Sequence, residues 1–230
     1  MREIVLDTET TGLDPNSGHK LVEIGCVEVV DRVRTGEVFH VYINPQRDMP
    51  DEAFRVHGLS SDFLSDKPLF KDVADDFLSF VGDSPLVIHN AQFDMKFINY
   101  ELKQIGKAEI PMERSVDTVV IARRKFPGSP ANLDALCKRF NIDLSARTKH
   151  GALLDAELLS DVYLELGGGR QSKLSLKTEN EQYAASNTRI VQREAIPPRE
   201  YTPSAEELAA HEAFVTKKVK NAMWLKVNQG

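Results

Sequence analysis

Two acidic side chains near the N-terminus could share a metal ion. Asp7 and Glu9 are separated by one residue in the run 4–9, whose β-branched and apolar start predicts a buried strand. Because successive side chains of a strand point to opposite faces, both carboxylates would lie on the same face. Solvated strand edges carry the same pattern, so this spacing alone leaves both interpretations open.

Three more polar residues stand at the starts of two expected helices. Asp94 follows the apolar run 86–89 by a few residues, and His150 and Asp155 lie around the start of the helix expected at 152–166. Each could have an ordinary structural role, since carboxylates complement the dipole at a helix start and a histidine before a helix is often structural. The complete set, on one strand end and two helix starts, favours a common site.

This set of residues suits the hydrolysis of a phosphodiester. It offers four hard oxygen ligands: Asp7, Glu9, Asp94 and Asp155. Such ligands suit Mg²⁺ or Mn²⁺ better than zinc, and two of these cations about 3.5–4 Å apart can stabilise the attacking and the leaving oxygen together. His150 would be the general base for the attacking water, because an imidazole titrates near neutral pH.

The hydrophobic pattern predicts an α/β fold around these residues. Strands are expected at 4–9, 21–30 and 38–44, with a reversal in the charged segment 31–37, which gives an antiparallel meander of three strands. Alternating elements follow, with strands at 86–89 and 116–117 and helices at 69–81, 93–105, 118–125, 133–140 and 152–166. Three antiparallel strands followed by β-α units predict a mixed sheet flanked by helices.

The composition narrows the class of protein. The 230 residues are 41% hydrophobic, which is enough for a real core, and no apolar stretch approaches the roughly 20 residues of a membrane span. Without a signal-peptide pattern, a cytoplasmic protein is expected, and Cys26 and Cys137 are expected to be buried free thiols. The net charge of -6 disfavours a broad basic surface for nucleic acid, so such a substrate would be held through metals or a tether.

Three segments carry a family likeness: 5–13 (VLDTETTGL), 89–94 (HNAQFD) and 147–156 (RTKHGALLDA). Together they resemble the DEDD exonucleases of the histidine subtype, and among them the epsilon family of proofreading subunits of bacterial DNA polymerase III. The likeness extends over residues 1–169. It implies a ribonuclease-H-like fold and the removal of mismatched nucleotides, as 5′-monophosphates, from a single-stranded or frayed DNA 3′ end.

The resemblance also implies the role of each residue. Asp7 would bridge two divalent cations, Mg²⁺ or Mn²⁺, with Glu9 and Asp155 as further ligands and Asp94 completing the site. The residues that would contact the terminal nucleotide are Asp7, Glu9, Thr10, Thr11, Glu52, His57, Asn90, Phe93 and Asp155.

Several of these residues could instead have purely structural roles. The segment 51–58, which contains Glu52 and His57, is by itself an exposed helix. Phe93 could belong to the core rather than stack on a base. Thr10 and Thr11 could form only the turn before Gly12.

The rest of the chain predicts a tether. Beyond the domain at 1–169, the segment 170–201 has few large apolar residues and is expected to be a flexible linker. A helical segment at 202–230 follows, and its start at Ser204 has the pattern of a capping box. The helical segment is too small for a core of its own, so its apolar residues are expected to dock on a partner.

Two partners are expected for this tether. In the linker, Gln171, Leu174 and Leu176 resemble the motif that binds the bacterial sliding clamp, although such short motifs also arise by chance. The resemblance implies the polymerase catalytic (alpha) subunit as the partner of the last segment, through Leu208, Phe214, Val215, Val219 and Trp224.

Two other functions remain open. An RNA-directed 3′-to-5′ exonuclease of the same superfamily would share the acidic residues but give no role to the linker and the last helix. A non-catalytic adaptor between clamp and polymerase would use the tether but would not need four carboxylates and a histidine.

Overall fold

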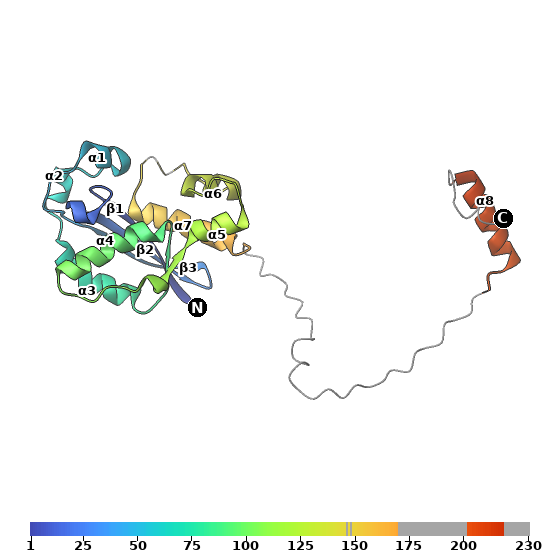
Figure 1. Ribbon diagram of the computed structural model, residues 1–230, viewed down its shortest axis with the longest axis horizontal. Helices are drawn as coiled ribbons and strands as arrows, with labels where there is room; N and C mark the ends of the chain where they lie inside the picture. The colour runs from blue at the N-terminus through green and yellow to red at the C-terminus, as the bar shows by residue number, and fades with distance from the viewer. Residues whose placement is uncertain (146, 148, 170–201, 219–230) are drawn as a thin grey trace, which may run out of the picture. The chain divides into compact units, whose positions relative to one another are not determined.

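The computed structural model describes residues 1–145, 147, 149–169 and 202–218, and the chain divides into two units, Met1–Ser175 and Leu176–Gly230. The described elements of the first unit are β1 (Arg2–Thr10), η1 (Pro15–Ser17), β2 (Leu21–Val30), β3 (Val33–Tyr42), α1 (Asp51–His57), α2 (Ser61–Leu64), α3 (Phe70–Val81), β4 (Leu86–Ile88), α4 (Ala91–Gln104), η2 (Met112–Arg114), β5 (Ser115–Asp117), α5 (Thr118–Lys125), α6 (Leu133–Phe140) and α7 (Ala152–Leu166) (Figure 1). The second unit contributes α8 (Ala205–Lys218).

The five strands form one mixed sheet in the order β3-β2-β1-β4-β5. β2 runs antiparallel to both β1 and β3, whereas β4 runs parallel to both β1 and β5. The prediction of a mixed α/β sheet is therefore confirmed. Because β1 and β4 are parallel neighbours, their carboxyl ends lie side by side, and the chain that follows β4 stays close to the end of β1.

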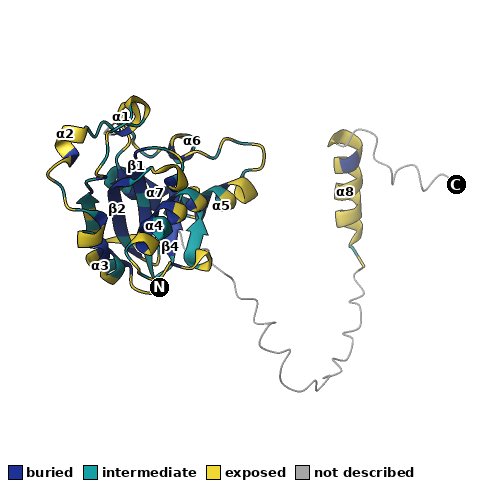
Figure 2. Cartoon of the chain, turned by 60° about the vertical axis from the view of Figure 1, so that its left-hand side comes forward, coloured by how far each residue is buried: buried dark blue, intermediate teal, exposed yellow. Residues whose placement is uncertain are grey.

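Side-chain alternation along β1 divides the core into two layers. Ile4 and Leu6 belong to one cluster of buried side chains, together with apolar residues of α3 and α4. Val5 belongs to the other cluster, together with residues of α5, α6 and α7. The middle of the sheet is thus buried on both faces between two groups of helices: β1, β2 and β4 are largely buried, whereas the edge strand β3 is largely exposed (Figure 2).

The reversal between β2 and β3 differs from the prediction. The turn consists of Asp31 and Arg32, whose φ angles are 51° and 67°, and Val30 pairs directly with Val33. Positive φ at both central residues is the geometry of a tight two-residue hairpin. The expectation that β3 begins near residue 38 was therefore wrong. After the exposed Val33, its next residues are exposed and lack large apolar side chains, so they show no apolar alternation, and Gly36 lies within the strand.

Other predictions hold closely. The helices expected at 118–125, 133–140 and 152–166 match α5, α6 and α7, and both cysteines are free and buried. Helix α1 is largely exposed, as expected, but its last residue His57 is buried. None of the described helices has the length and apolar character that crossing a bilayer requires.

Helix α8 begins with the predicted capping box. The amide of Glu207 donates to Ser204 Oγ (3.2 Å), and the amide of Ser204 donates to Glu207 Oε2 (2.9 Å). Val215 is buried, whereas Leu208 and Phe214 are 54% and 60% exposed. The division of the chain into domain, linker and helical segment stays a prediction.

Candidate active site

The four carboxylates and the histidine singled out from the sequence line one cavity of about 440 Å³. Asp7 and Glu9 stand at the end of β1, and Asp94 lies in the first turn of α4, which begins just after β4. Asp155 lies in the first turn of α7, and His150 immediately precedes that helix. Three separate segments of the chain therefore bring their polar groups to one place.

Gly25 determines how closely α7 approaches the sheet. It pairs with Asp7 across β2 and β1. A Cβ atom at this position would lie 2.3 Å from the carbonyl carbon of Ala152 and from the amide nitrogen of Leu153. The backbone of the first turn of α7 thus rests directly on the strand, which carries Asp155 to the end of β1.

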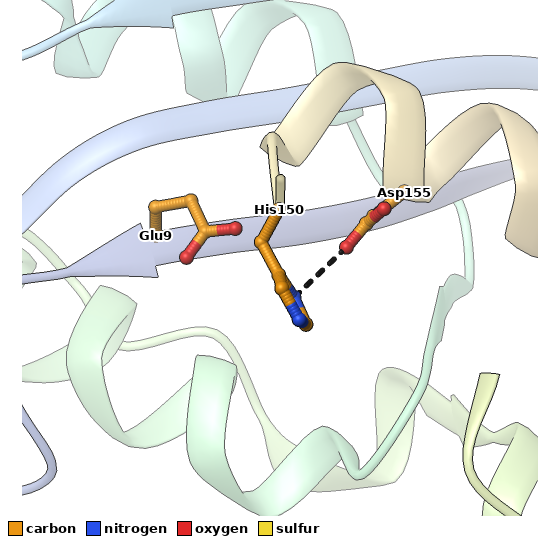
Figure 3. Close-up of side chains that lie close together, drawn as sticks. All are labelled: Glu9, His150 and Asp155. Carbon is orange, nitrogen blue, oxygen red and sulfur yellow. Dashed lines mark ion pairs between the residues drawn. The ribbon is translucent and has the colours of Figure 1, made fainter. Parts of the chain in front are cut away.

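Asp155 and His150 lie against each other in the cavity. His150 Nδ1 is 3.3 Å from Asp155 Oδ2, and 49% of the His150 side chain is exposed. Glu9, His150 and Asp155 each offer a ligand atom, and these atoms lie within 4.8 Å of one another. Figure 3 shows Glu9 reaching from β1 towards the two residues at the start of α7.

The electrostatics of the cavity are those of an acidic cluster in which most of the carboxylates have no positively charged partner in the described part of the chain. Burial raises the pKa of Glu9 to about 8, with further increases from the charges of Asp155 and Glu23. Burial and the charges of Asp94 and Glu9 also raise the pKa of Asp7 well above its usual value. Burial raises the pKa of Asp94 to about 7, although a hydrogen bond from Thr8 acts in the opposite direction.

This donor set fits hard divalent cations. Asp7, Glu9 and Asp94 lie in a confined space and have raised pKa values, so a positive charge placed among them would be strongly stabilised. Oxygen ligands of this kind are those that Mg²⁺ and Mn²⁺ prefer.

Sequence reasoning assigned no role to several residues of the cavity. The hydroxyl of Thr8 donates to Asp94 Oδ1 (2.7 Å). Arg147 donates to both carboxylate oxygens of Asp155 and also to Asp134 Oδ1, each at 2.6–2.7 Å. Thr8 and Arg147 both stand inside the family-like segments, so their position was the available signal. Nothing in the spacing of Asp134 indicated that it would reach the cavity.

A second cavity, of about 500 Å³, adjoins the acidic one, and Thr8, Glu9 and Phe93 line both. Its wall includes four more residues expected to contact the nucleotide: Thr10, Thr11, Glu52 and His57. Leu13 and Val56 add apolar surface. Asn90 is placed differently: it lines another hollow, with His89 and Asp117, and does not line either of these two cavities.

The side chains in this second wall differ in what they can offer to a ligand. Thr10 donates its hydroxyl to Gly12 O (2.6 Å), and Thr11 Oγ1 accepts from the amide of Lys20 (3.0 Å), so both stabilise the turn. His57 Nδ1 accepts from the amide of Leu59 (3.0 Å), whereas its buried Nε2 has no hydrogen-bond partner among the described residues. Phe93 packs on the core as well as lining the cavity, so the two interpretations of this ring are compatible.

The expected tether contacts are only partly within the described residues. Gln171, Leu174, Leu176, Val219 and Trp224 lie outside them. Leu208, Phe214 and Val215 are on α8.

Comparisons with known proteins show the family to which the chain belongs. A family model described as "Exonuclease" matches residues 4–163. The chain is 52% identical over 230 residues to the DNA polymerase III subunit epsilon of Rickettsia felis, with 96% of this chain and 99% of that protein covered. It is 46% identical over 237 residues to the subunit of the same name from Escherichia coli (strain K12), with 97% of each covered.

Solved structures show the same fold. Exonuclease X in complex with 5′ overhanging duplex DNA is 26% identical with a TM-score of 0.55, covering 71% of this chain and 89% of that one. The nuclease domain of 3′hExo, a DEDDh family member bound to rAMP, is 18% identical with a TM-score of 0.61, covering 73% of this chain and 92% of that one. This second likeness concerns the fold alone.

Proposed function

The chain belongs to the exonuclease family, and within it to the DNA polymerase III epsilon subunits, so we propose that the acidic cavity is where it removes nucleotides from a DNA 3′ end. Its activity is that of a 3′-to-5′ proofreading exonuclease. The convergence of Asp7, Glu9, Asp94, Asp155 and His150 on one cavity is the observation that supports this location.

The carboxylates would hold two divalent cations, Mg²⁺ or Mn²⁺. Asp7 would be shared between them, with Glu9 and Asp155 as further ligands and Asp94 completing the site. Bound cations of this kind supply Lewis acidity and lower the pKa of a water ligand. The raised pKa values of Asp7 and Glu9 support this assignment, because neither of these two carboxylates has an ion-pair partner among the described residues.

His150 is proposed as the general base. When Nδ1 donates its proton to Asp155 Oδ2, which lies 3.3 Å away, the lone pair of Nε2 is free to accept a proton from the attacking water. The half-exposed ring can then pass this proton to solvent. Asp155 would hold the ring in the tautomer that leaves Nε2 unprotonated.

The adjoining cavity is proposed to hold the terminal nucleotide. Phe93, Leu13 and Val56 offer apolar surface to a base, which suits an unpaired nucleotide of any sequence. His57 also lines this cavity, and its ring proton is on Nε2 because Nδ1 accepts a hydrogen bond from the amide of Leu59. A mismatched terminus frays at lower cost and therefore reaches such a pocket more often.

Digestion of a primer with a 3′ mismatch tests this proposal. With Mg²⁺, release of nucleoside 5′-monophosphates should be faster from the mismatched primer than from the matched one, and a chelator should stop it. An RNA oligomer of the same sequence separates DNA-directed from RNA-directed activity. His150→Ala and Asp7→Ala should each abolish hydrolysis while the protein stays folded. Near-normal hydrolysis by the purified double variant would contradict the mechanism.

The tail is proposed to bind two proteins. Gln171, Leu174 and Leu176 would bind the sliding clamp. The helical segment 202–230 would bind the polymerase catalytic subunit, and the exposed Leu208 and Phe214 of α8 support this proposal. Such binding would keep the active site near the primer end at a high effective concentration, so an acidic protein would need little affinity of its own for DNA.

Two variants test the tether separately from the chemistry. Leu174→Ala with Leu176→Ala should weaken binding to the purified clamp, and Phe214→Ser should weaken binding to the purified catalytic subunit. Neither variant should alter the hydrolysis of a free single-stranded oligonucleotide. Unchanged binding in both cases would refute the assignment of these segments.

A further inference from the structure

Arg147 binds the carboxylate of Asp155, which the cations would need as a ligand. Arg147 Nε donates to Asp155 Oδ1 and Nη2 donates to Asp155 Oδ2, both at 2.6 Å. This is the paired geometry in which a planar guanidinium binds a carboxylate most strongly. The side chain of Arg147 is only 10% exposed, and that of Asp155 only 4%. Both oxygens of a proposed metal ligand are therefore bound to a positive charge within the protein.

The same guanidinium affects the proposed general base. Arg147 Nη2 lies 3.0 Å from His150 Nδ1. Because an arginine only donates hydrogen bonds, this contact is a hydrogen bond only when Nδ1 accepts it. The ring proton is then on Nε2, and the nitrogen that would take the proton of the attacking water is already protonated. This arrangement disables the base at the same time as it occupies the metal ligand.

The charges of the cavity explain why Arg147 stays there. Among the described residues that line the cavity, Arg147 is the only one with a permanent positive charge. Burial alone would raise the pKa of Asp155, but the hydrogen bonds and the charge of Arg147, with a smaller contribution from His150, outweigh burial and lower it. Asp155 is therefore held as an anion beside Arg147, whereas Asp7, Glu9 and Asp94 have no such partner and have raised pKa values.

We propose that Arg147 is a positioning residue that stands in for a cation: it holds Asp155 and His150 when the site is metal-free and releases Asp155 when divalent cations bind. The inference rests on the proposed two-cation site. Arg147 also has a second carboxylate partner, because its Nη1 donates to Oδ1 of Asp134 on α6 at 2.7 Å. The arginine can therefore leave Asp155 and still remain attached at the edge of the cavity. Arginine and metal would compete for one carboxylate, so each would weaken the binding of the other.

Thermodynamic linkage between Arg147 and the cations tests this competition. Arg147→Met removes the charge but keeps an unbranched apolar stem, and it leaves Asp155 buried without its partner. The melting temperature of the variant should be lower than that of the wild type without metal. With saturating Mn²⁺ this difference should shrink, because a ligand that binds the folded state more tightly stabilises it more. Mn²⁺ binding, followed by electron paramagnetic resonance, should become tighter by about fivefold or more.

The control is an arginine with similar contacts far from the cavity. Arg2, at the other end of β1, bonds to Glu28, and its Nη groups donate to Ser84 Oγ and Phe80 O at 2.7 Å. Arg2→Met should lower the melting temperature equally with and without Mn²⁺. Arg147→Lys keeps the charge but loses the paired geometry, so it should show a smaller change in the same direction as Arg147→Met. If Arg147→Met does not fold without metal, Arg147→Lys still allows the comparison with the wild type.

Each outcome has a definite meaning. A difference in melting temperature that stays the same or widens with Mn²⁺ would overturn the inference, since Arg147 would then be structural or would assist the metal. Unchanged or weaker Mn²⁺ binding by the variants would overturn it as well. Wild-type protein that binds no Mn²⁺ would instead refute the proposed metal site.

Discussion

Adding one methyl group at Gly25 should separate the two halves of the active site. Gly25 pairs with Asp7, and its added Cβ would lie 2.3 Å from backbone atoms of Ala152 and Leu153. Non-bonded carbon atoms normally lie about 3.5 Å or more apart, so α7 and β2 would have to separate by about 1 Å. The clashing atoms belong to the backbone, so no side-chain rotation relieves the contact. The start of α7 must move as a unit.

The size of the expected loss in kcat follows from the residues that move with the start of α7. Asp155 and His150 both belong to the displaced region, whereas Asp7 and Glu9 stay on β1. A misplacement of about 1 Å can cost about 100-fold in rate. An overpacked core contact costs about 1–3 kcal/mol, against a total stability of about 5–15 kcal/mol for an ordinary domain. Gly25→Ala is therefore expected to stay folded at 25 °C while kcat falls by about 100-fold.

The assay measures hydrolysis of a single-stranded oligonucleotide at saturating Mg²⁺ beside thermal unfolding by circular dichroism. The matched control is Gly151→Ala, since a Cβ at Gly151 has no atom within 4 Å and its φ of -161° is open to any residue. This control should keep near-normal activity. Wild-type kcat in Gly25→Ala, or an equal loss in Gly151→Ala, would refute the role of the close approach.

The buried acidic groups lead to three further predictions. Thr8→Val removes the hydrogen bond to Asp94 and should lower activity or metal affinity by about 10–100-fold, measured by Mg²⁺ titration of the rate. In the metal-free protein, the pKa values of Glu9 (about 8) and Asp94 (about 7) exceed their unfolded values, so the melting temperature should fall as pH rises from 6.5 to 8. Calorimetry should show a smaller fall in melting temperature over this pH range for Glu9→Gln. A fall as large as that of the wild type would contradict the assignment of this pH dependence to Glu9. Asp7→Asn should raise the metal-free melting temperature, because an amide replaces a buried carboxyl whose ionised form is disfavoured by burial and by its acidic neighbours, while it abolishes hydrolysis.

The elements with strong apolar periodicity were predictable from the sequence. Helices α5, α6 and α7 have the expected bounds because each places apolar residues on a core-facing side and ends near a clear change in pattern. β1 was recognisable because it is buried on both faces. The start of β3 was not, since it lies at the edge of the sheet with exposed polar residues that follow no alternation.

The site was predictable in its ligands and less so in its environment. Strand alternation places Asp7 and Glu9 on one face, and the position of the other three residues at two helix starts favoured a common site, but their individual roles came from a family resemblance. The contacts of Arg147 could not be predicted from the sequence, because they depend on the conformation of its long side chain. The link from Arg147 to Asp134 joins two segments whose proximity is decided by the packing of α6 on α7. No local pattern reports such packing.

Burial of the acidic cluster and the acidity of the whole chain belong to one physical argument. Placing carboxylates away from water without a counter-charge costs free energy, so a cation that binds among them would remove part of this cost and would be bound tightly. A DNA phosphate could then be bound through those cations rather than through lysine and arginine. The chain, with a net charge of -6, would gain little from nonspecific attraction to paired DNA. Weak attraction favours proofreading, since a nuclease that held every duplex end tightly would also remove correctly paired nucleotides.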